Sequence, residues 1–161
     1  MSGFGLSEEL QISRKEAENY INDYFDKHKK VKEYMDNQIA SCKEKGYSET
    51  ILGRKRPIHE INASAYMVRQ LGERLAMNSP IQGSAADIIK VAMVKVHNSL
   101  RARFPETKLI LQVHDELILC VPKKDEEAVR ELLKNDMQEA VKLSVKLVAD
   151  VNEGYTWYDL K

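Results

Sequence analysis

The stretch LILQVHDELILCV, residues 109–121, decides how this sequence folds. Two apolar runs of strand length, 109–113 and 117–121, flank the polar tripeptide His114-Asp115-Glu116. Short apolar runs bounded by a turn predict β-strands, so we expect a hairpin with the tripeptide at its tip. Tight hairpins usually turn through glycine or Asn-Gly, which tolerate positive φ, yet this turn contains no glycine.

Asp115 and Glu116 place two carboxylates side by side in that turn. The two carboxylates repel each other, and an exposed turn gains nothing from placing them together. A divalent cation would relieve this repulsion, because hard cations prefer carboxylate oxygens. Mg²⁺ commonly uses one or two protein carboxylates and takes its other ligands from water and phosphates. The turn is therefore a candidate metal site, and the alternative interpretation is a solvated polar turn.

The sequence after the hairpin predicts one helix and one strand. Apolar residues at helical spacing follow Asp125, which we expect to cap a helix, and residues 146–151 are predicted to form a last strand. Cys120 lies in an apolar run and is expected to pack as a small hydrophobe. Helices first, then a strand–strand–helix–strand unit, indicate an α+β fold with a small antiparallel sheet packed on helices.

The N-terminal part of the sequence predicts a helix pair after a short loop. Residues 1–6 contain two glycines and are predicted to be a loop. Ser13 and Glu16 have the spacing of a capping box, which predicts that a helix begins there. A second predicted helix runs from about Val31 to Gly46.

A short hairpin is predicted around Leu52-Gly53, because β-prone residues lie on both sides. Pro57 cannot donate a backbone hydrogen bond, which assigns the second strand to a sheet edge. Arg54 and Arg56, with the lysine between them, form its exposed basic tip.

A helix with an apolar face is predicted to begin after a cap at Asn62 or Ser64, and residues 78–80, Asn-Ser-Pro, are predicted to interrupt it. A longer helix then begins at about Ile81. Gln82 and Asp87 would lie near its N-terminus, where free N–H groups suit phosphate or base-edge contacts and Gly83 would allow close approach. The alternative is that these are ordinary polar residues of a first turn.

Bulk composition neither favours nor excludes a nucleic-acid partner. Lys+Arg and Asp+Glu both total 25, giving zero formal charge, although lysines cluster within residues 27–32. Cys42 and Cys120 lie outside any CxxC pattern and are expected to be free thiols in a reducing cytoplasm. The sequence contains no apolar run of membrane-spanning length and no signal-peptide pattern, so we expect a cytoplasmic protein without a membrane partner.

Several motifs resemble the bacterial family A DNA polymerases. Residues 111–117, Leu-Gln-Val-His-Asp-Glu-Leu, resemble motif C of that family without a gap. Residues 72–90 are similar to the segment leading into its long palm helix, and residues 46–56 resemble its fingers-to-palm hairpin. Trp157-Tyr158 also resembles the ending of bacterial members, so the likeness covers essentially the whole chain in the right order.

The resemblance implies a DNA-directed DNA polymerase, a nucleotidyltransferase of DNA replication and repair. Such enzymes add dNTPs to a primer 3′ end by two-metal phosphoryl transfer, so primer-template DNA, dNTPs and two Mg²⁺ ions are the implied partners and cofactors. Residues 1–60 would be a remnant of the fingers subdomain with the basic hairpin. Residues 61–161 would be the C-terminal part of the palm.

The resemblance also assigns roles to individual residues. Asp115 would be a catalytic Mg²⁺ ligand, with Glu116 in a supporting catalytic role beside the metals. His114 would contact the primer terminus, and residues 2–5 would lie near the template base. The remaining DNA contacts would come from Arg74, Asn78, Gln82, Arg54 and Arg56.

Two functional parts of that family would precede Met1. These are the other shared metal-binding aspartate and the fingers helix that binds the triphosphate, with its main nucleotide-binding residues. We therefore expect this chain alone to be inactive and its Mg²⁺ binding to be weak. A homodimer through an exposed palm face is a further expectation.

Two other functions are compatible with the residues. A non-catalytic DNA-binding module would use residues 54–56, Arg74 and Gln82, with Asp115 and Glu116 idle, and metal dependence would distinguish it from the polymerase. A small metal-dependent hydrolase would use residues 114–116. The sequence offers no second cluster of metal ligands to support that third interpretation.

Overall fold

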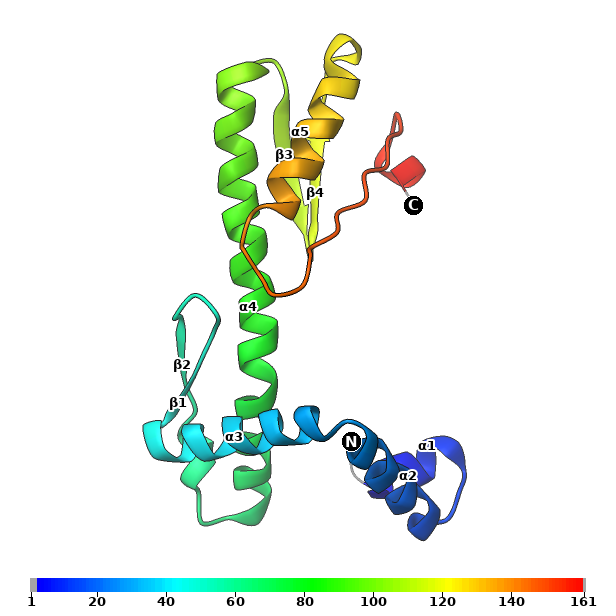
Figure 1. Cartoon of the computed structure of the whole chain (residues 1–161), viewed down its shortest axis with the longest axis vertical. Helices are drawn as coiled ribbons and strands as arrows, with labels where there is room; N and C mark the ends of the chain where they lie inside the picture. The colour runs from blue at the N-terminus through cyan, green and yellow to red at the C-terminus, as the bar shows by residue number, and fades with distance from the viewer. Residues whose placement is uncertain (1–2, 161) are drawn as a thin grey trace. The chain divides into compact units, whose positions relative to one another are not determined.

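The computed structural model describes residues 3–160, so residues 1 and 2, part of the predicted N-terminal loop, lie outside it. The chain divides into two compact units. The first contains the residues up to Glu49 and the segment Lys55–Pro80, and the second contains Thr50–Arg54 and the residues from Ile81 onward. Helices predominate, and the strands form two separate two-stranded antiparallel sheets, which confirms the α+β class (Figure 1).

The first unit begins with three helices, α1 (Gly3–Leu10), α2 (Arg14–Lys27) and α3 (Lys29–Lys45). Ser13 caps α2, because its Oγ accepts a hydrogen bond from the Glu16 backbone N–H at 3.2 Å. The predicted helix pair is therefore confirmed. The loop predicted over residues 1–6 is wrong for residues 3–6, which form the first turn of α1, and α1 packs against α2.

A short hairpin follows α3, after Gly46 ends that helix in the left-handed conformation with φ of 76°. Strands β1 (Tyr47–Glu49) and β2 (Lys55–Pro57) pair antiparallel, as predicted. Pro57 lies opposite Tyr47 at the end of the ladder, where a missing N–H is tolerated. The sheet has two strands, so each strand is an edge.

The core of the first unit lies between α3, the 3₁₀ helix η1 (His59–Asn62) and the start of α4. Its buried residues are Cys42, Ile58, Ile61 and Ala76. The two cysteines are free thiols, as expected, but Cys120 does not pack as a small hydrophobe. Cys42 is buried, which raises the pKa of its thiol, whereas Cys120 is exposed because its side chain points away from the core face of its strand.

Helix α4 (Tyr66–Arg103) runs without interruption through Pro80. The predicted break at residues 78–80 is therefore wrong. Proline inside a helix removes one backbone hydrogen bond and costs about 3 kcal/mol. The helix persists because Ser79 and Pro80 are themselves buried, so tertiary packing outweighs the local preference.

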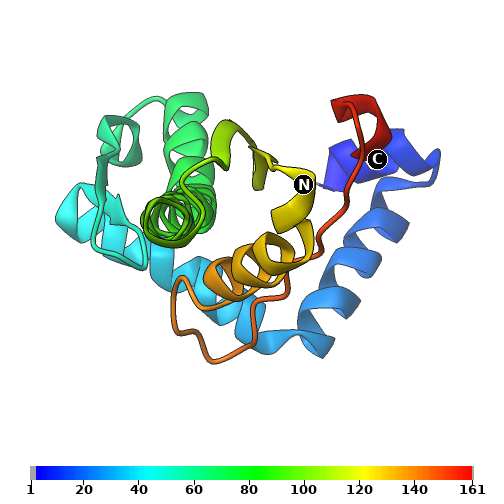
Figure 2. The same ribbon diagram turned by 90° about the horizontal axis from the view of Figure 1, so that it is seen from above.

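The second unit packs helices on the hairpin that was predicted first. Strands β3 (Lys108–Val113) and β4 (Glu116–Cys120) pair antiparallel, with a bulge between Leu109 and Leu111. The 3₁₀ helix η2 (Lys123–Asp125) leads into α5 (Glu126–Gln138), where Asp125 occupies the N-cap position without a side-chain capping bond. Viewed along α4, helix α5 and the hairpin lie beside it (Figure 2).

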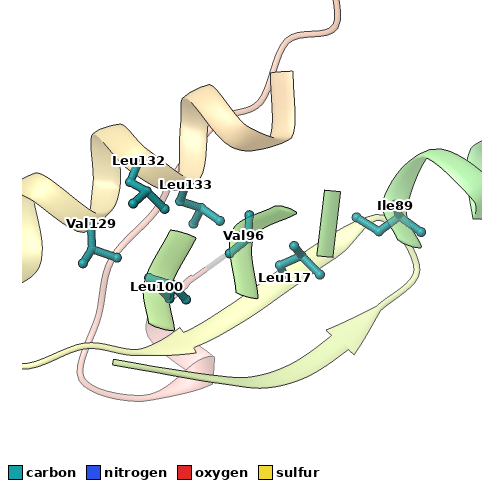
Figure 3. Packing of buried hydrophobic residues seen from close by; sticks show 7 residues of the cluster. All are labelled: Ile89, Val96, Leu100, Leu117, Val129, Leu132 and Leu133. Carbon is teal, nitrogen blue, oxygen red and sulfur yellow. The ribbon is translucent and has the colours of Figure 1, made fainter. Parts of the chain in front are cut away.

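Apolar side chains from α4, β4 and α5 meet between these elements (Figure 3). They are Ile89, Val96, Leu100, Leu117, Val129, Leu132 and Leu133. This core fixes the hairpin on the helices.

The strand predicted over residues 146–151 is wrong. That segment has no regular secondary structure, and the chain then ends in the 3₁₀ helix η3 (Trp157–Leu160). A strand needs a hydrogen-bonded neighbour, and among residues 3–160 the sheet of β3 and β4 has two strands that pair with each other. Val148 is correspondingly exposed.

Candidate metal site and nucleic-acid contacts

The turn between β3 and β4 consists of two residues, His114 and Asp115, because Val113 pairs directly with Glu116. His114 has φ of 52°, in the left-handed region that glycine usually fills in such a turn. Non-glycine residues hold such a conformation at a cost of about 1–2 kcal/mol, and strain of this kind concentrates at functional sites. The sequence placed the tripeptide at the tip, and the structure adds that its first residue is strained.

Gln112 braces the strained turn. Its Nε2 donates a hydrogen bond to the carbonyl oxygen of His114 at 2.6 Å. Sequence reasoning assigned no role to Gln112. The sequence feature that could have indicated this role is the amide side chain of Gln112 within the otherwise apolar run 109–113.

The carboxylates of Asp115 and Glu116 are adjacent and exposed. Neither makes a hydrogen bond or ion pair with another residue of the described range 3–160. The same range holds no group of three or more His, Cys, Asp or Glu side chains suited to a metal. Two open carboxylates fit Mg²⁺, which can complete its shell with water and phosphate oxygens.

We expect His114→Gly to stabilise the second unit by about 0.5–1 kcal/mol, because relief of the left-handed strain exceeds the extra chain entropy of glycine. Urea unfolding followed by circular dichroism measures the change. His114→Ala is the matched control, since it removes the imidazole but keeps the strained Cβ. A glycine variant less stable than the alanine variant would show that the turn is not strained.

The predicted duplex-contact residues of α4 are open to solvent. Arg74, Asn78 and Gln82 recur at every fourth position of the helix and are exposed. Such spacing puts them on one helical face. Because α4 is continuous at this point, Gln82 lies in mid-helix. The backbone N–H groups beside it belong to the helix interior and are not the free groups of a helix N-terminus that were expected.

The basic residues after the first hairpin's turn are each held by a different contact. Nε of Arg54 donates to Oδ1 of Asp87 at 2.7 Å, and Nη1 of Arg56 donates to Oγ of Ser79 at 3.1 Å. Nζ of Lys55 lies 4.7 Å from the ring centre of Tyr47. All three remain exposed, as predicted.

Asp87 is a buried residue of α4, and the prediction that it lies near a helix N-terminus is wrong. Its pKa is held below the usual value, first by the hydrogen bond from Thr50 Oγ1 at 2.6 Å and then by Arg54. Gly83 allows Thr50 to come close enough to α4 for this hydrogen bond. A Cβ at Gly83 would lie 2.6 Å from the Thr50 methyl group, so the close approach is made by the chain's own loop.

Comparison with known proteins identifies the family of this chain. The family profile described as DNA polymerase family A matches residues 1–159, and the chain belongs to that family. DNA polymerase I of Streptococcus pneumoniae serotype 4 (strain ATCC BAA-334 / TIGR4) is 49% identical over 161 residues, which cover 100% of this chain and 18% of that protein. DNA polymerase I of Caldicellulosiruptor bescii is 47% identical and is covered to 19%.

A solved structure is similar over nearly the whole chain. It is described as the POL domain of Pol1 from M. smegmatis in complex with DNA primer-template and dNTP. The TM-score is 0.95 at 38% identity, and the match covers 99% of this chain and 28% of that one. The chain thus spans about a fifth of the length of the curated relatives named above. Among the described residues, no helix is long and apolar enough to cross a membrane.

Proposed function

We propose that this chain is part of a DNA-directed DNA polymerase and supplies one of its metal-binding carboxylates, Asp115. The observation that carries the proposal is the β3–β4 hairpin, which the buried core holds on α4 and α5 and whose tip presents two open carboxylates, in a chain that belongs to DNA polymerase family A. The substrates are dNTPs and a primer-template duplex, and the reaction extends the primer 3′ end. The polymerase serves DNA replication and repair.

Each residue of the tripeptide 114–116 has a separate task in this proposal. Asp115 binds Mg²⁺, Glu116 adds negative charge beside it, and His114 contacts the primer terminus. Two Mg²⁺ ions in the complete enzyme stabilise the charge that develops on the attacking and leaving oxygens. The strained turn, braced by Gln112, orients the Asp115 carboxylate before DNA arrives.

The duplex contacts are proposed for two surfaces. Arg74, Asn78 and Gln82 on α4 face the minor groove near the primer end, because amide and guanidinium groups can donate to its acceptors. Arg54 and Arg56 contact phosphates. Residues 1–60 correspond to part of the fingers and residues 61–161 to part of the palm.

We propose that the 161-residue polypeptide alone is inactive. Two ions held about 4 Å apart need carboxylates on both sides, and the described turn offers one pair on one side. Triphosphate binding also needs a cluster of cations. Weak divalent binding, on the order of millimolar, follows from so few protein ligands.

DNA binding and primer extension by the purified chain test this proposal together. We expect salt-sensitive binding to duplexes of any sequence, with a log–log slope of about −0.9 for each phosphate neutralised, and no template-dependent extension with Mg²⁺ and dNTPs. Fluorescence anisotropy across a salt series and a labelled-primer gel provide the readouts. Binding that ignores salt, or strong preference for one sequence, would contradict the DNA contacts, and extension by the pure chain would contradict its inactivity.

We also propose that the chain forms a homodimer through the exposed apolar surface of β3. Ile110 and Leu111 of β3 are exposed, and an open sheet edge with apolar side chains favours self-association. Sedimentation over a concentration series tests it, and an unchanging monomer mass would rule it out.

A further inference from the structure

The loop Thr50–Arg54 is attached to α4 by a compact set of hydrogen bonds within the second unit. Asp87 accepts from Thr50 Oγ1 at 2.6 Å through Oδ2 and from Arg54 Nε at 2.7 Å through Oδ1. Ser84 Oγ accepts a hydrogen bond from the Ile51 backbone N–H at 2.9 Å. The backbone N–H of Arg54 donates to Thr50 Oγ1 at 3.1 Å. The loop is therefore fixed at both of its ends.

The ion pair between Arg54 and Asp87 is asymmetric. The side chain of Asp87 is 2% exposed, whereas that of Arg54 is 63% exposed. A buried carboxylate is costly unless it is paired and hydrogen-bonded, and here both oxygens have donors. Asp87 is consequently a fixed anchor, and the outer part of Arg54 remains in solvent.

Arg54 is held through Nε, the guanidinium nitrogen nearest the backbone, which donates to Asp87. Among residues 3–160, its terminal Nη1 and Nη2 make no hydrogen bond. Arginine recognises phosphate with two parallel N–H donors of its planar guanidinium, and a fixed plane loses less entropy on binding. A guanidinium fixed through Nε retains both terminal donors for such a phosphate.

We infer that Asp87 is a positioning residue, which orients the guanidinium of Arg54 for a phosphate of the DNA backbone. This inference rests on the proposed function, because it takes DNA as the ligand of Arg54. Asp87 itself touches no DNA. Its contribution passes through Arg54, with Thr50 and Gly83 allowing the loop to approach the helix.

For Asp87→Asn, a positioning role and simple electrostatics predict changes in duplex affinity of opposite sign. Removing a negative charge from a protein that binds a polyanion should strengthen binding if charge alone matters. Loss of the anchor instead frees the guanidinium to rotate, so we expect duplex affinity to fall about threefold to tenfold. Glu106→Gln removes the same charge at an exposed ion pair with Lys124 and should leave affinity unchanged or slightly higher.

A double-mutant cycle on the full chain tests the inference, with anisotropy on a labelled duplex as readout. We expect Arg54→Ala to lower affinity about tenfold, and Asp87→Asn to add nothing in that background, because it acts through Arg54. Arg54→Lys keeps the charge of an exposed residue but lacks the planar fork, so it should lose most of the same affinity. Circular dichroism confirms that each variant is folded.

The outcomes separate the inference from the proposed function. If wild-type chain binds no duplex, or if Arg54→Ala has no effect, the proposed DNA contact is wrong and the inference falls with it. If Arg54→Ala weakens binding but Asp87→Asn behaves like Glu106→Gln, the inference alone is overturned. Should Asp87→Asn fail to fold, full affinity in folded Arg54→Lys would equally overturn it.

Discussion

Asp115→Ala is expected to reduce primer extension about a thousandfold or more in a polymerase that contains this segment. The loss of a metal-binding carboxylate removes several kcal/mol of transition-state stabilisation, and each 1.36 kcal/mol is a factor of ten in rate. The side chain is exposed and makes no hydrogen bond with another residue in the range 3–160, so its removal should leave the fold intact. The effect should therefore appear in kcat.

A segment-exchange polymerase allows this measurement. In it, the present 161 residues replace the corresponding segment of the pneumococcal relative, which is 49% identical over that length. Glu106→Gln is the control, because it removes one exposed carboxylate at the opposite end of β3 from the turn. Unchanged kcat in the Asp115→Ala protein would exclude Asp115 as a catalytic metal ligand.

Gly72→Ala is expected to destabilise the first unit by about 2–3 kcal/mol. In an ordinary helix the same change stabilises by up to about 1 kcal/mol, so the sign itself is informative. A Cβ at Gly72 would lie 2.6 Å from the backbone nitrogen of Ile61, and backbone in a packed core cannot move aside at low cost. Urea unfolding measures the difference from wild type.

Gly83→Ala is the matched comparison within the same helix. Its Cβ would meet the Cγ2 atom of Thr50, and a shift of this side chain weakens one hydrogen bond to Asp87 without moving backbone, so the expected loss is smaller than at Gly72. Equal losses, or stabilisation by Gly72→Ala, would show that the contact between α4 and η1 is looser than the structure indicates.

Features set by local sequence were predictable. Ser13 as a cap, Gly46 as a helix end and the two hairpins depend on residues close together in the chain, and the structure contains all of them. The carboxylate pair at the β3–β4 turn was likewise visible, because two strand-length runs define its position. The sequence also showed that this turn has no glycine, but the left-handed conformation of His114 emerged from the structure.

Features set by distant contacts were not predictable from local patterns. The continuity of α4 through Pro80 depends on burial of that turn, and residues 146–151 form no strand because they have no hydrogen-bonded neighbour strand among the described residues. The role of Asp87 arises from Thr50 and Arg54, which lie 37 and 33 residues earlier. No local spacing rule connects those positions.

Primer extension by the segment-exchange polymerase with the unaltered 161 residues shows whether this chain can supply a catalytic carboxylate. If this chain supplies a working catalytic carboxylate and duplex contacts, the exchanged protein should extend a primer in a template-dependent and Mg²⁺-dependent manner, within about tenfold of the parent rate, a difference of about 1.4 kcal/mol. An exchanged protein that is folded and binds primer-template with the parent's affinity, yet extends no primer, would contradict the claim.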